Sequence, residues 1–305
     1  MHHKLLLCLV VVACTPREDA APSADTTATS TAPRQAERLH SIAGFSTPES
    51  VIHDSVADFY FVSNIAGNPS AKDNNGFISR VRPDGGVDSL RFVSGGRNGV
   101  TLHAPKGMAI TGDTLWVTDI DVVRGFDRST GRPVATVTLG PQARFLNDLA
   151  VGPDGALFAT ETGIRISAAG AMEPTGLDAV FRIQGRRGAR AIRDSALSAP
   201  NGITWSAGRM LIASARDSAL HAWTEGGTLE RIGNTAGGAD GLDVLADGRI
   251  IGSSWADSTV SVVGDSVYRL ISGLVSPADF GLDRRRGYLV VPLFQADRVE
   301  IWRLP

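Results

Sequence analysis

The feature that most constrains this chain is a short motif that occurs six times along it. The clearest copy, at residues 198–204, reads Ser-Ala-Pro-Asn-Gly-Ile-Thr. When the copies are aligned on Asn201, the aligned residues are Glu49, Lys106, Asn147, Asn201, Asp240 and Ala278. The steps between them are 57, 41, 54, 39 and 38 residues. A period near 40 residues, with one strand start in each unit, is typical of β-propeller blades, so six copies predict six blades.

The segments between these copies indicate an all-β fold. Short runs rich in Val, Ile, Leu and Thr are separated by turn pairs such as Asp154-Gly155 and Asp247-Gly248. Such pairs are typical of tight hairpin turns. We therefore predict an all-β, six-bladed β-propeller over residues 39–305. Residues 39–43 are expected to form the outermost strand of the last blade, next to a strand in residues 297–304, because this pairing closes the ring and removes exposed sheet edges.

Two segments are longer than the repeat requires. Residues 64–75 lengthen the first blade, and residues 165–179 lengthen the third. Long loops in compact domains often form binding loops or lids, but variable surface loops explain them equally well. The sequence leaves their role open.

The N-terminal segment has the composition of an export signal. A basic residue, Lys4, is followed by an apolar run over residues 5–12, and the small residue Ala13 precedes Cys14. This arrangement resembles a bacterial lipoprotein signal peptide, in which the cysteine at this place is lipidated. We predict that residues 1–14 contain the signal peptide and lipobox, with Cys14 as the lipidation site. An ordinary secretory signal with a chance cysteine is the alternative.

Residues 15–38 follow this signal and are rich in Ala, Ser, Thr and Pro, without apolar periodicity. Such a composition predicts a disordered tether. Together with Cys14, the tether predicts an exported bacterial lipoprotein that is anchored to a membrane and faces the periplasm or the cell exterior.

Composition and missing motifs argue against several classes of function. The formal net charge is -2 and there is no basic stripe, which gives no support for nucleic-acid binding. Both cysteines, Cys8 and Cys14, lie in the predicted signal segment, so the propeller has no disulfide, cysteine nucleophile or cysteine-type zinc site. A Gly-rich phosphate loop and a Gly-x-Ser-x-Gly elbow are absent, which argues against nucleotide-dependent and serine-hydrolase chemistry.

The aligned positions carry the chemistry that we expect at the propeller axis. Equivalent positions of all blades converge there, so the aligned residues bring two carboxylates, Glu49 and Asp240, and two amides, Asn147 and Asn201, together. This oxygen-only set suits Ca²⁺, although another divalent metal is also compatible. Two buried carboxylates without a cation would repel each other and lose hydration. For a single copy, turn chemistry at a strand start is the better explanation, but four oxygen donors at one aligned position favour a metal site.

With these residues the chain resembles the SMP-30/gluconolactonase/LRE family, whose relatives include diisopropylfluorophosphatase-type and paraoxonase-type propellers. The resemblance covers residues 39–305. It is carried by the runs Pro48-Glu49-Ser50-Val51, Phe145-Leu146-Asn147-Asp148, Ala199-Pro200-Asn201-Gly202 and Ala239-Asp240-Gly241. It implies that Glu49, Asn147, Asn201 and Asp240 bind a divalent metal, commonly calcium. It also implies that the activity is hydrolysis of a lactone or, in relatives, of a phosphotriester.

The resemblance implies roles for single residues as well. Asp240 would be the general base or nucleophile beside the metal, because calcium lowers the pKa of bound water far less than zinc does. Arg144 resembles a substrate-contacting arginine of the family, although its spacing to Asn147 is one residue longer here. Apart from the resemblance, Lys106 takes the aligned position of blade two, where it would bind an anionic substrate or pair with Asp240 or Glu49; a solvated loop lysine is an equal alternative.

Two functions of different classes are compatible with the sequence. The first is a calcium-dependent lactonase or related esterase, expected to be a monomer, that acts on a small molecule at the axis. The second is a non-enzymatic, NHL-like binding module with a structural calcium, because the Pro-x-Gly-Met and Pro-Asn-Gly-Ile runs also resemble NHL-type propellers. The titratable pair Asp240 and Lys106 favours the enzyme, since a structural calcium needs no additional titratable group.

Overall fold

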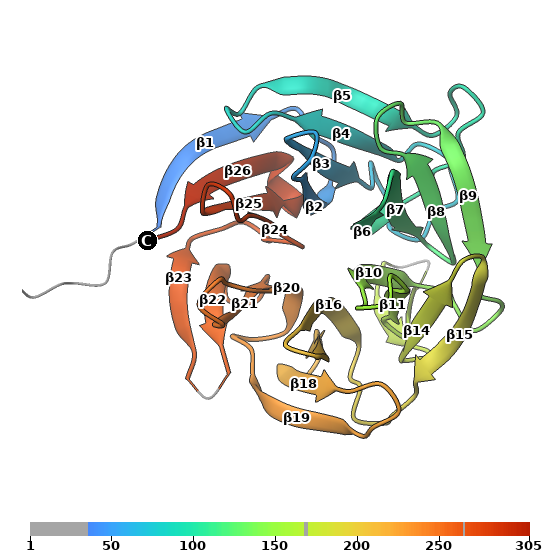
Figure 1. The fold of residues 1–305 in the computed structure, drawn as a ribbon, viewed down its shortest axis with the longest axis vertical. Coiled ribbons are helices and arrows are strands. Elements are labelled where there is room, and N and C mark those ends of the chain that lie inside the picture. The colour runs from blue at the N-terminus through green and yellow to red at the C-terminus, as the bar shows by residue number, and fades with distance from the viewer. Residues whose placement is uncertain (1–35, 168–169, 265) are drawn as a thin grey trace, which may run out of the picture. The chain divides into compact units, whose positions relative to one another are not determined.

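Six four-stranded antiparallel sheets surround a central axis, as Figure 1 shows. They belong to a computed structural model that describes residues 36–167, 170–264 and 266–305. These described residues form one compact unit. The predicted signal peptide, Cys14 and residues 15–35 of the predicted tether lie outside the described residues, and no described helix is long and apolar enough to cross a membrane. The prediction of an all-β, six-bladed β-propeller is confirmed.

In the first three blades the strands follow chain order from the axis to the rim. Blade one consists of β2 (Pro48–Asp54), β3 (Phe59–Asn64), β4 (Phe77–Val81) and β5 (Val87–Ser94). Blade two consists of β6 (Pro105–Thr111), β7 (Thr114–Asp119), β8 (Val122–Asp127) and β9 (Pro133–Thr138). Blade three consists of β10 (Leu146–Val151), β11 (Leu157–Glu161), β14 (Ala179–Gln184) and β15 (Arg187–Ile192). A separate hairpin, inserted between β11 and β14, consists of β12 (Ile164–Ile166) and β13 (Met172–Pro174).

The last three blades repeat this order, except that blade six takes its outermost strand from the start of the chain. Blade four consists of β16 (Pro200–Ser206), β17 (Arg209–Ser214), β18 (Ala219–Trp223) and β19 (Leu229–Asn234). Blade five consists of β20 (Ala239–Val244), β21 (Ile250–Ser254), β22 (Thr259–Val263) and β23 (Tyr268–Ser272). Blade six consists of β24 (Gly281–Asp283), β25 (Tyr288–Leu293), β26 (Arg298–Arg303) and β1 (Glu37–Ala43). The 3-10 helix η1 (Phe294–Ala296) links β25 to β26.

The strand β1 closes the ring. It pairs antiparallel with β26, with Glu37 opposite Arg303 and Ala43 opposite Arg298. The N-terminal strand therefore completes the last blade, as the sequence predicts. The predicted tether extends too far, however, because Glu37 and Arg38 already belong to β1. Pairing with β26 supplies their backbone groups with hydrogen-bond partners, which explains why the strand begins there.

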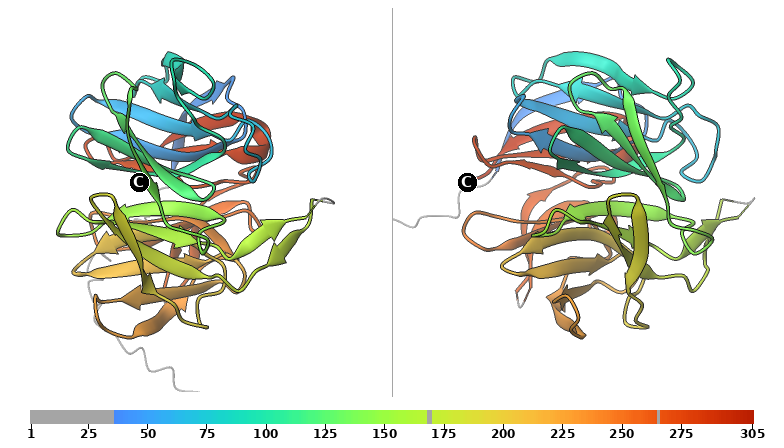
Figure 2. Two further views of the ribbon diagram at one scale, coloured as in Figure 1. Left: turned by 90° about the vertical axis from the view of Figure 1, so that its right-hand side faces the viewer. Right: turned by 45° about the vertical axis from the view of Figure 1, so that its right-hand side comes forward.

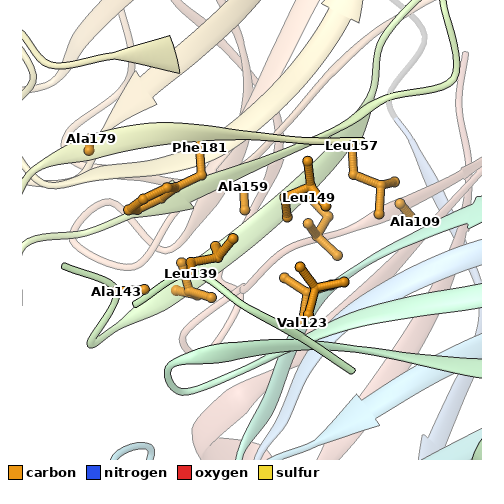
Figure 3. Packing of buried hydrophobic residues seen from close by; sticks show 12 residues of the cluster. Ala109, Val123, Leu139, Ala143, Leu149, Leu157, Ala159, Ala179 and Phe181 are labelled. Atoms are coloured by element: carbon orange, nitrogen blue, oxygen red, sulfur yellow. The ribbon is translucent and has the colours of Figure 1, made fainter. Parts of the chain in front are cut away.

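The hydrophobic core lies between neighbouring blades. In the cluster of Figure 3, Val123 from β8 in blade two packs with Leu149 from β10 and Phe181 from β14 in blade three. All three side chains are buried. Alternate residues of a strand face one side of its sheet, so each sheet offers an apolar face to the next blade. This packing holds the inner strands in place around the axis.

Both long insertions leave their blades at the end of the second strand. The β12–β13 hairpin pairs Ile164 with Pro174 and stands out from one face of the propeller, as the yellow-green segment of Figure 2 shows. The other insertion, between β3 and β4, is held at Asn74, whose Oδ1 accepts a hydrogen bond from Leu102 N at 2.8 Å. Because the second strand runs antiparallel to the inner strand, its end lies beside the start of the inner strand. Both insertions therefore reach the same end of the axis.

Candidate active site at the propeller axis

The starts of five inner strands meet at a cavity of about 260 Å³. The second residue of β2, β6, β10, β16 and β20 lines it; these residues are Glu49, Lys106, Asn147, Asn201 and Asp240. All five are at most 9% exposed. The structure thus brings the four predicted metal ligands together, and Lys106 with them. In blade six the aligned residue, Ala278, precedes β24 and has no ligand atom in its side chain.

A β-bulge marks each of these five positions. The inner strand shifts register against its neighbour between Pro48 and Ser50 in blade one and between Pro200 and Ile203 in blade four. The same shift occurs at the equivalent point of blades two, three and five. A bulge leaves one residue outside the regular pairing and redirects its side chain. The bulges explain how side chains at strand starts can point into a shared cavity.

Hydroxyl side chains on the second strands fix the backbone of these bulges. Thr160 Oγ1 on β11 accepts a hydrogen bond from Asp148 N and donates one to Asn201 O in the next blade, each at 2.9 Å. Ser253 Oγ on β21 makes the equivalent two bonds between blades five and six, each at 2.8 Å. Each hydroxyl satisfies a buried backbone amide at the bulge and links two neighbouring inner strands.

Glycine follows the axial residue where neighbouring inner strands come close together. A Cβ atom on Gly202 would lie 2.4 Å from Asp240 O, and one on Gly241 would lie 2.8 Å from the Cα atom of Asp279. Both separations are far below the contact distance of non-bonded atoms, so only glycine fits. The Pro-Asn-Gly and Ala-Asp-Gly runs therefore reflect packing around the axis and not a turn at the strand start.

Two carboxylate oxygens in the cavity lack a partner. Glu49 Oε2 and Asp240 Oδ1 are buried and make no hydrogen bond with the described residues. Burial raises the pKa of Glu49 well above its usual range, and the neighbouring Asp240 raises it further. Burial also raises the pKa of Asp240, to about 7, although Trp255 and Asn201 beside it oppose the shift. A buried carboxylate pair of this kind is costly unless a cation is present.

Lys106 supplies a buried ammonium group at the same cavity. Its Nζ donates to Pro69 O at 3.1 Å and to Ala104 O at 3.3 Å, and it lies 4.5 Å from the centre of the Phe145 ring. Burial lowers the pKa of Lys106, and the charge of Glu49 opposes this shift. The ammonium therefore offsets part of the charge of Glu49 but leaves the Oε2 atom of that residue without a hydrogen bond.

The donor set fits a hard divalent cation. The Nδ2 atom of Asn147 donates to Thr162 Oγ1 at 3.2 Å, which leaves the Oδ1 atom of Asn147 available. Glu49, Asn201 and Asp240 add further oxygen ligands around the same cavity. Calcium accepts six to eight oxygen ligands and completes its shell with water. The two unpartnered carboxylate oxygens are the strongest indication that these residues hold such an ion.

A second row of carboxylates lies further along the inner strands. Asp148, Asp243 and Asp279 line a wider cavity of about 440 Å³ at the other end of the axis. Burial raises the pKa of all three, that of Asp148 to about 7. Unlike the first pair, these groups have partners in the protein. Asp148 accepts two backbone amides at 2.7 and 2.8 Å, Asp279 accepts the Ser50 hydroxyl at 2.5 Å, and Asp243 accepts an Arg284 guanidinium at 2.7 Å.

A third acidic cluster lies where the inner strands of blades one and six end. His53, Asp58 and Asp283 each bring one candidate ligand atom within 4.8 Å of the others. Arg286 donates to Asp58 Oδ2 at 2.6 Å and to Asp283 Oδ2 at 2.8 Å, and Tyr60 also donates to Asp283 Oδ2, at 2.7 Å. Because the guanidinium already neutralises both carboxylates, this cluster fits an ion-pair network better than a cation site.

Arg144 does not reach the axial cavity. Its side chain is exposed and lines a separate surface hollow, and its Nε donates to Pro141 O at 3.3 Å. Its backbone amide donates to Glu161 Oε2, which also accepts a bond from Phe145 N at 2.9 Å. The interpretation of Arg144 as a substrate contact is therefore not supported by its position. The shared contact with Glu161 shapes the loop before β10 and uses only the backbone of Arg144.

Residues 74–266 match the model of a known family, described as SMP-30/Gluconolactonase/LRE-like region. The chain belongs to this family. The matched region includes Lys106, Asn147, Asn201 and Asp240, and Glu49 precedes it. The family resemblance of the sequence is thus confirmed, and the protein is a lactonase-like propeller at the family level. Members of this family are typically metal-dependent, which agrees with the oxygen donors at the axis.

Solved structures with the same fold include enzymes of more than one reaction class. A gluconolactonase of Xanthomonas campestris has a TM-score of 0.65 at 17% identity, covering 89% of this chain and 95% of that one. A luciferin-regenerating enzyme has a TM-score of 0.63 at 11% identity, covering 90% and 95%. A virginiamycin B lyase of Staphylococcus aureus has a TM-score of 0.57 at 13% identity, covering 87% and 99%. No curated protein sequence matches this chain. At these identities the likeness shows the fold alone.

Sequence reasoning missed the residues that form the wall of the cavity. In five blades the wall includes the first residue after the second strand; these residues are Ile65, Thr162, Ala215, Trp255 and Phe294. The rings of Trp255 and Phe294 are in contact, with centroids 4.7 Å apart. The repeat itself could have indicated these positions, because the end of a second strand lies beside the start of its inner strand in every blade.

Proposed function

We propose that this protein is a calcium-dependent hydrolase that opens a small lactone or a related ester at the propeller axis. The observation that carries this proposal is the pair of unpartnered, buried carboxylate oxygens, Glu49 Oε2 and Asp240 Oδ1, beside a cavity of about 260 Å³. A purely structural ion needs no such cavity next to it, whereas a reaction needs room for a substrate. Membership of the SMP-30/gluconolactonase/LRE-like family supports the lactone as the reacting group.

The axial residues have different roles in this reaction. Glu49, Asn147, Asn201 and Asp240 would hold the calcium ion, which supplies a Lewis acid that polarises the substrate carbonyl when it is bound. Asp240 accepts a proton from the attacking water, because its carboxylate lies at the cavity in which the substrate would bind. The water oxygen bonds to the carbonyl carbon, the ring C–O bond breaks, and the proton passes to the leaving oxygen to give a hydroxy acid.

Lys106 is the fifth axial group, and it bears a positive charge where the reaction creates a negative one. Two of its three N–H groups have backbone partners, at 3.1 and 3.3 Å. This leaves one donor for the cavity. In the proposed reaction, Lys106 stabilises the carboxylate of the hydroxy acid product through charge attraction in a buried site, where such attraction is stronger than in water.

The test uses the full-length chain, with Asp240→Asn as the variant and Asp279→Asn as the matched control at the other end of the axis. We expect calcium to raise the melting temperature and the wild type to hydrolyse δ-valerolactone. The Asp240→Asn variant should lose about 100-fold or more in kcat, as expected for loss of a general base. The control should stay within about fivefold, because Asp279 does not line the reacting cavity.

Three results would contradict this proposal in different ways. Calcium stabilisation without cleavage of any lactone, ester or phosphotriester would make the ion structural and favour the binding-module alternative. The absence of any calcium effect would overturn the axial metal site itself. A product carboxylate without label after reaction in ¹⁸O-labelled water would indicate elimination instead of hydrolysis, because only hydrolysis places the label there.

We also propose that the protein is exported and anchored by a lipid on Cys14, on the strength of the apolar run over residues 5–12 and the small residue before this cysteine. The membrane would then be a partner through the N-terminal anchor. Fractionation of expressing bacterial cells tests this: the wild type should remain with the membranes, and Cys14→Ser should not be lipidated. Equal membrane retention and lack of label from a radioactive fatty acid in both proteins would overturn the anchor.

A further inference from the structure

The axial cavity has two unlike parts. Its floor consists of the polar axial residues. Its wall is formed mainly by apolar side chains from blades one, three, five and six and from the loop before β10. We call these side chains the apolar wall; they are Ile65, Phe145, Ile164, Met172, Trp255 and Phe294.

Few polar groups in this cavity have hydrogen-bonding capacity to spare. Thr162 Oγ1 already donates to a backbone carbonyl at 3.0 Å and accepts from an amide at 3.2 Å. The ammonium of Lys106 already has two carbonyl partners. Among the side chains that line the cavity, the buried atoms without a partner in the described chain are Glu49 Oε2, Asp240 Oδ1 and Trp255 Nε1. The two carboxylate oxygens would face the proposed cation, and the Trp255 side chain lies beside Asp240 and lowers its pKa, so few of these groups are left for the hydroxyl groups of a substrate.

Because the cavity has many apolar side chains and few polar groups with spare hydrogen-bonding capacity, we propose that the substrates are apolar lactones or esters. Their alkyl or aryl substituent would pack against the apolar wall, which polyhydroxylated sugar lactones could not do. This inference rests on the proposed function. A sugar lactone would bring several hydroxyl groups out of water, and each one that finds no partner weakens binding. An alkyl or aryl group, by contrast, gains free energy when it leaves water for the same wall.

The wall also extends beyond the mouth of the cavity. Ile164, at the base of the β12–β13 hairpin, is 8% exposed, whereas Met172 on its second strand is 67% exposed. This hairpin stands out from the propeller face in Figure 2. A substituent longer than the lactone ring would therefore lie along the hairpin and cover Met172, whose flexible thioether adapts to varied apolar shapes.

The experiment compares three lactones with the same six-membered ring and different substituents: δ-valerolactone, δ-decalactone and δ-gluconolactone. We expect kcat/KM of the calcium-loaded, full-length protein to be at least about tenfold higher for δ-decalactone than for δ-valerolactone. For δ-gluconolactone it should be at least about tenfold lower than for δ-valerolactone, after subtraction of spontaneous hydrolysis. Met172→Ser should remove most of the advantage of δ-decalactone over δ-valerolactone. Val56→Ser, at another exposed apolar side chain that does not line this cavity, should change neither.

A binding measurement gives a readout that does not depend on turnover. By calorimetry, the calcium-loaded protein should bind 3-pentylcyclohexanone, a ketone that cannot be hydrolysed, at least about tenfold more tightly than cyclohexanone. Preference for δ-gluconolactone, or equal binding of the two ketones, would overturn the inference about substrate class while leaving lactone hydrolysis intact. Tighter binding of the pentyl ketone without turnover of any lactone would retain the apolar wall as the recognition surface and overturn the proposed function.

Discussion

The two ends of the propeller axis carry similar residues in different states. At one end, Glu49 Oε2 and Asp240 Oδ1 accept no hydrogen bond from the described residues. At the other end, Asp148 is also buried and Asp279 is half-buried, and backbone amides and the Ser50 hydroxyl donate hydrogen bonds to their oxygens. Burial raises the pKa of the carboxyl groups at both ends. A raised pKa therefore does not by itself distinguish the candidate active site from its surroundings.

The two ends differ in whether the protein supplies hydrogen-bond partners for the carboxylate oxygens. Asp148 links its own strand to the next blade through Ile203 N, at 2.8 Å, so it contributes to the packing of the inner strands. Glu49 and Asp240 hold no strand together through their free oxygens. Buried polar groups without partners are rare in proteins, and each requires a reason such as a ligand or an ion. The larger cavity, of about 440 Å³, lies at the end where the carboxylates have hydrogen-bond partners. Carboxylate oxygens without a partner are therefore a better guide to the site than cavity size.

The strongest test of this difference removes one negative charge at each end of the axis. Glu49→Gln should weaken calcium binding by about 100-fold or more, because it replaces a charged ligand with a neutral one. Asp279→Asn should weaken it by less than about fivefold, through its longer-range charge alone. Isothermal titration calorimetry of the chelator-treated protein measures both values. Loss of calcium binding in Asp279→Asn, with binding retained in Glu49→Gln, would reverse the assignment of the two ends.

The melting temperature, measured over a series of pH values in the presence of a chelator, tests the same difference. An acid whose pKa is raised by folding stabilises the fold fully below its unfolded pKa, near 4, and loses this contribution as the pH rises through the folded value. The folded value for Asp240 is about 7, so stability should fall between about pH 4 and pH 7. We expect the melting temperature in chelator to decrease by on the order of 5 °C from pH 5 to pH 8.

Calcium should separate the contributions of the two ends to this pH dependence. Part of the decrease in melting temperature from pH 5 to pH 8 depends on Asp240 and is lost in Asp240→Asn, and calcium should remove the same part. The part that depends on Asp279, and is lost in Asp279→Asn, should remain when calcium is bound. A melting temperature in chelator that does not change from pH 5 to pH 8 would contradict the burial of ionisable carboxylates at both ends.

The smallest expected effect concerns the positive charges near the cavity. Lys106→Met should strengthen calcium binding by about threefold to tenfold, because a buried ammonium beside Glu49 repels the ion. Arg144→Met removes the same charge from an exposed side chain outside the cavity and should change the affinity by less than about twofold. Calorimetry at a single ionic strength compares the two variants. Equal effects from both would mean that the net charge of the protein, and not the place of Lys106, governs the affinity.

Much of the fold was readable from the sequence, because each blade is a local unit with its own turns and strand lengths. The spacing of the motif predicted six blades, and the pairing of β1 with β26 followed from the need to close the ring. The limit of the tether was wrong, since Glu37 and Arg38 resemble tether residues in composition and only pairing with β26 places them in a strand.

The candidate site was predictable in part. The alignment grouped Glu49, Asn147, Asn201 and Asp240, and the structure places them at one cavity; that they bind calcium stays a prediction. Arg144 was assigned because it resembles a substrate-contacting arginine that precedes the equivalent asparagine in the family. A bend before β10 separates them, because Glu161 binds the backbone amide of Arg144 while the side chain of Arg144 turns outward.

The sequence by itself determined the blade repeat and the identity of the residues that meet at the axis, because a period of strands and a closed ring leave those positions little freedom. Only the tertiary structure decided which carboxylate oxygens accept hydrogen bonds from the protein and which do not. That distinction depends on contacts across blades, such as the amide of Ile203 at Asp148 in the blade before it. It decided the apolar wall for the same reason, since Trp255 and Phe294 come from different blades and meet only when blades five and six pack together.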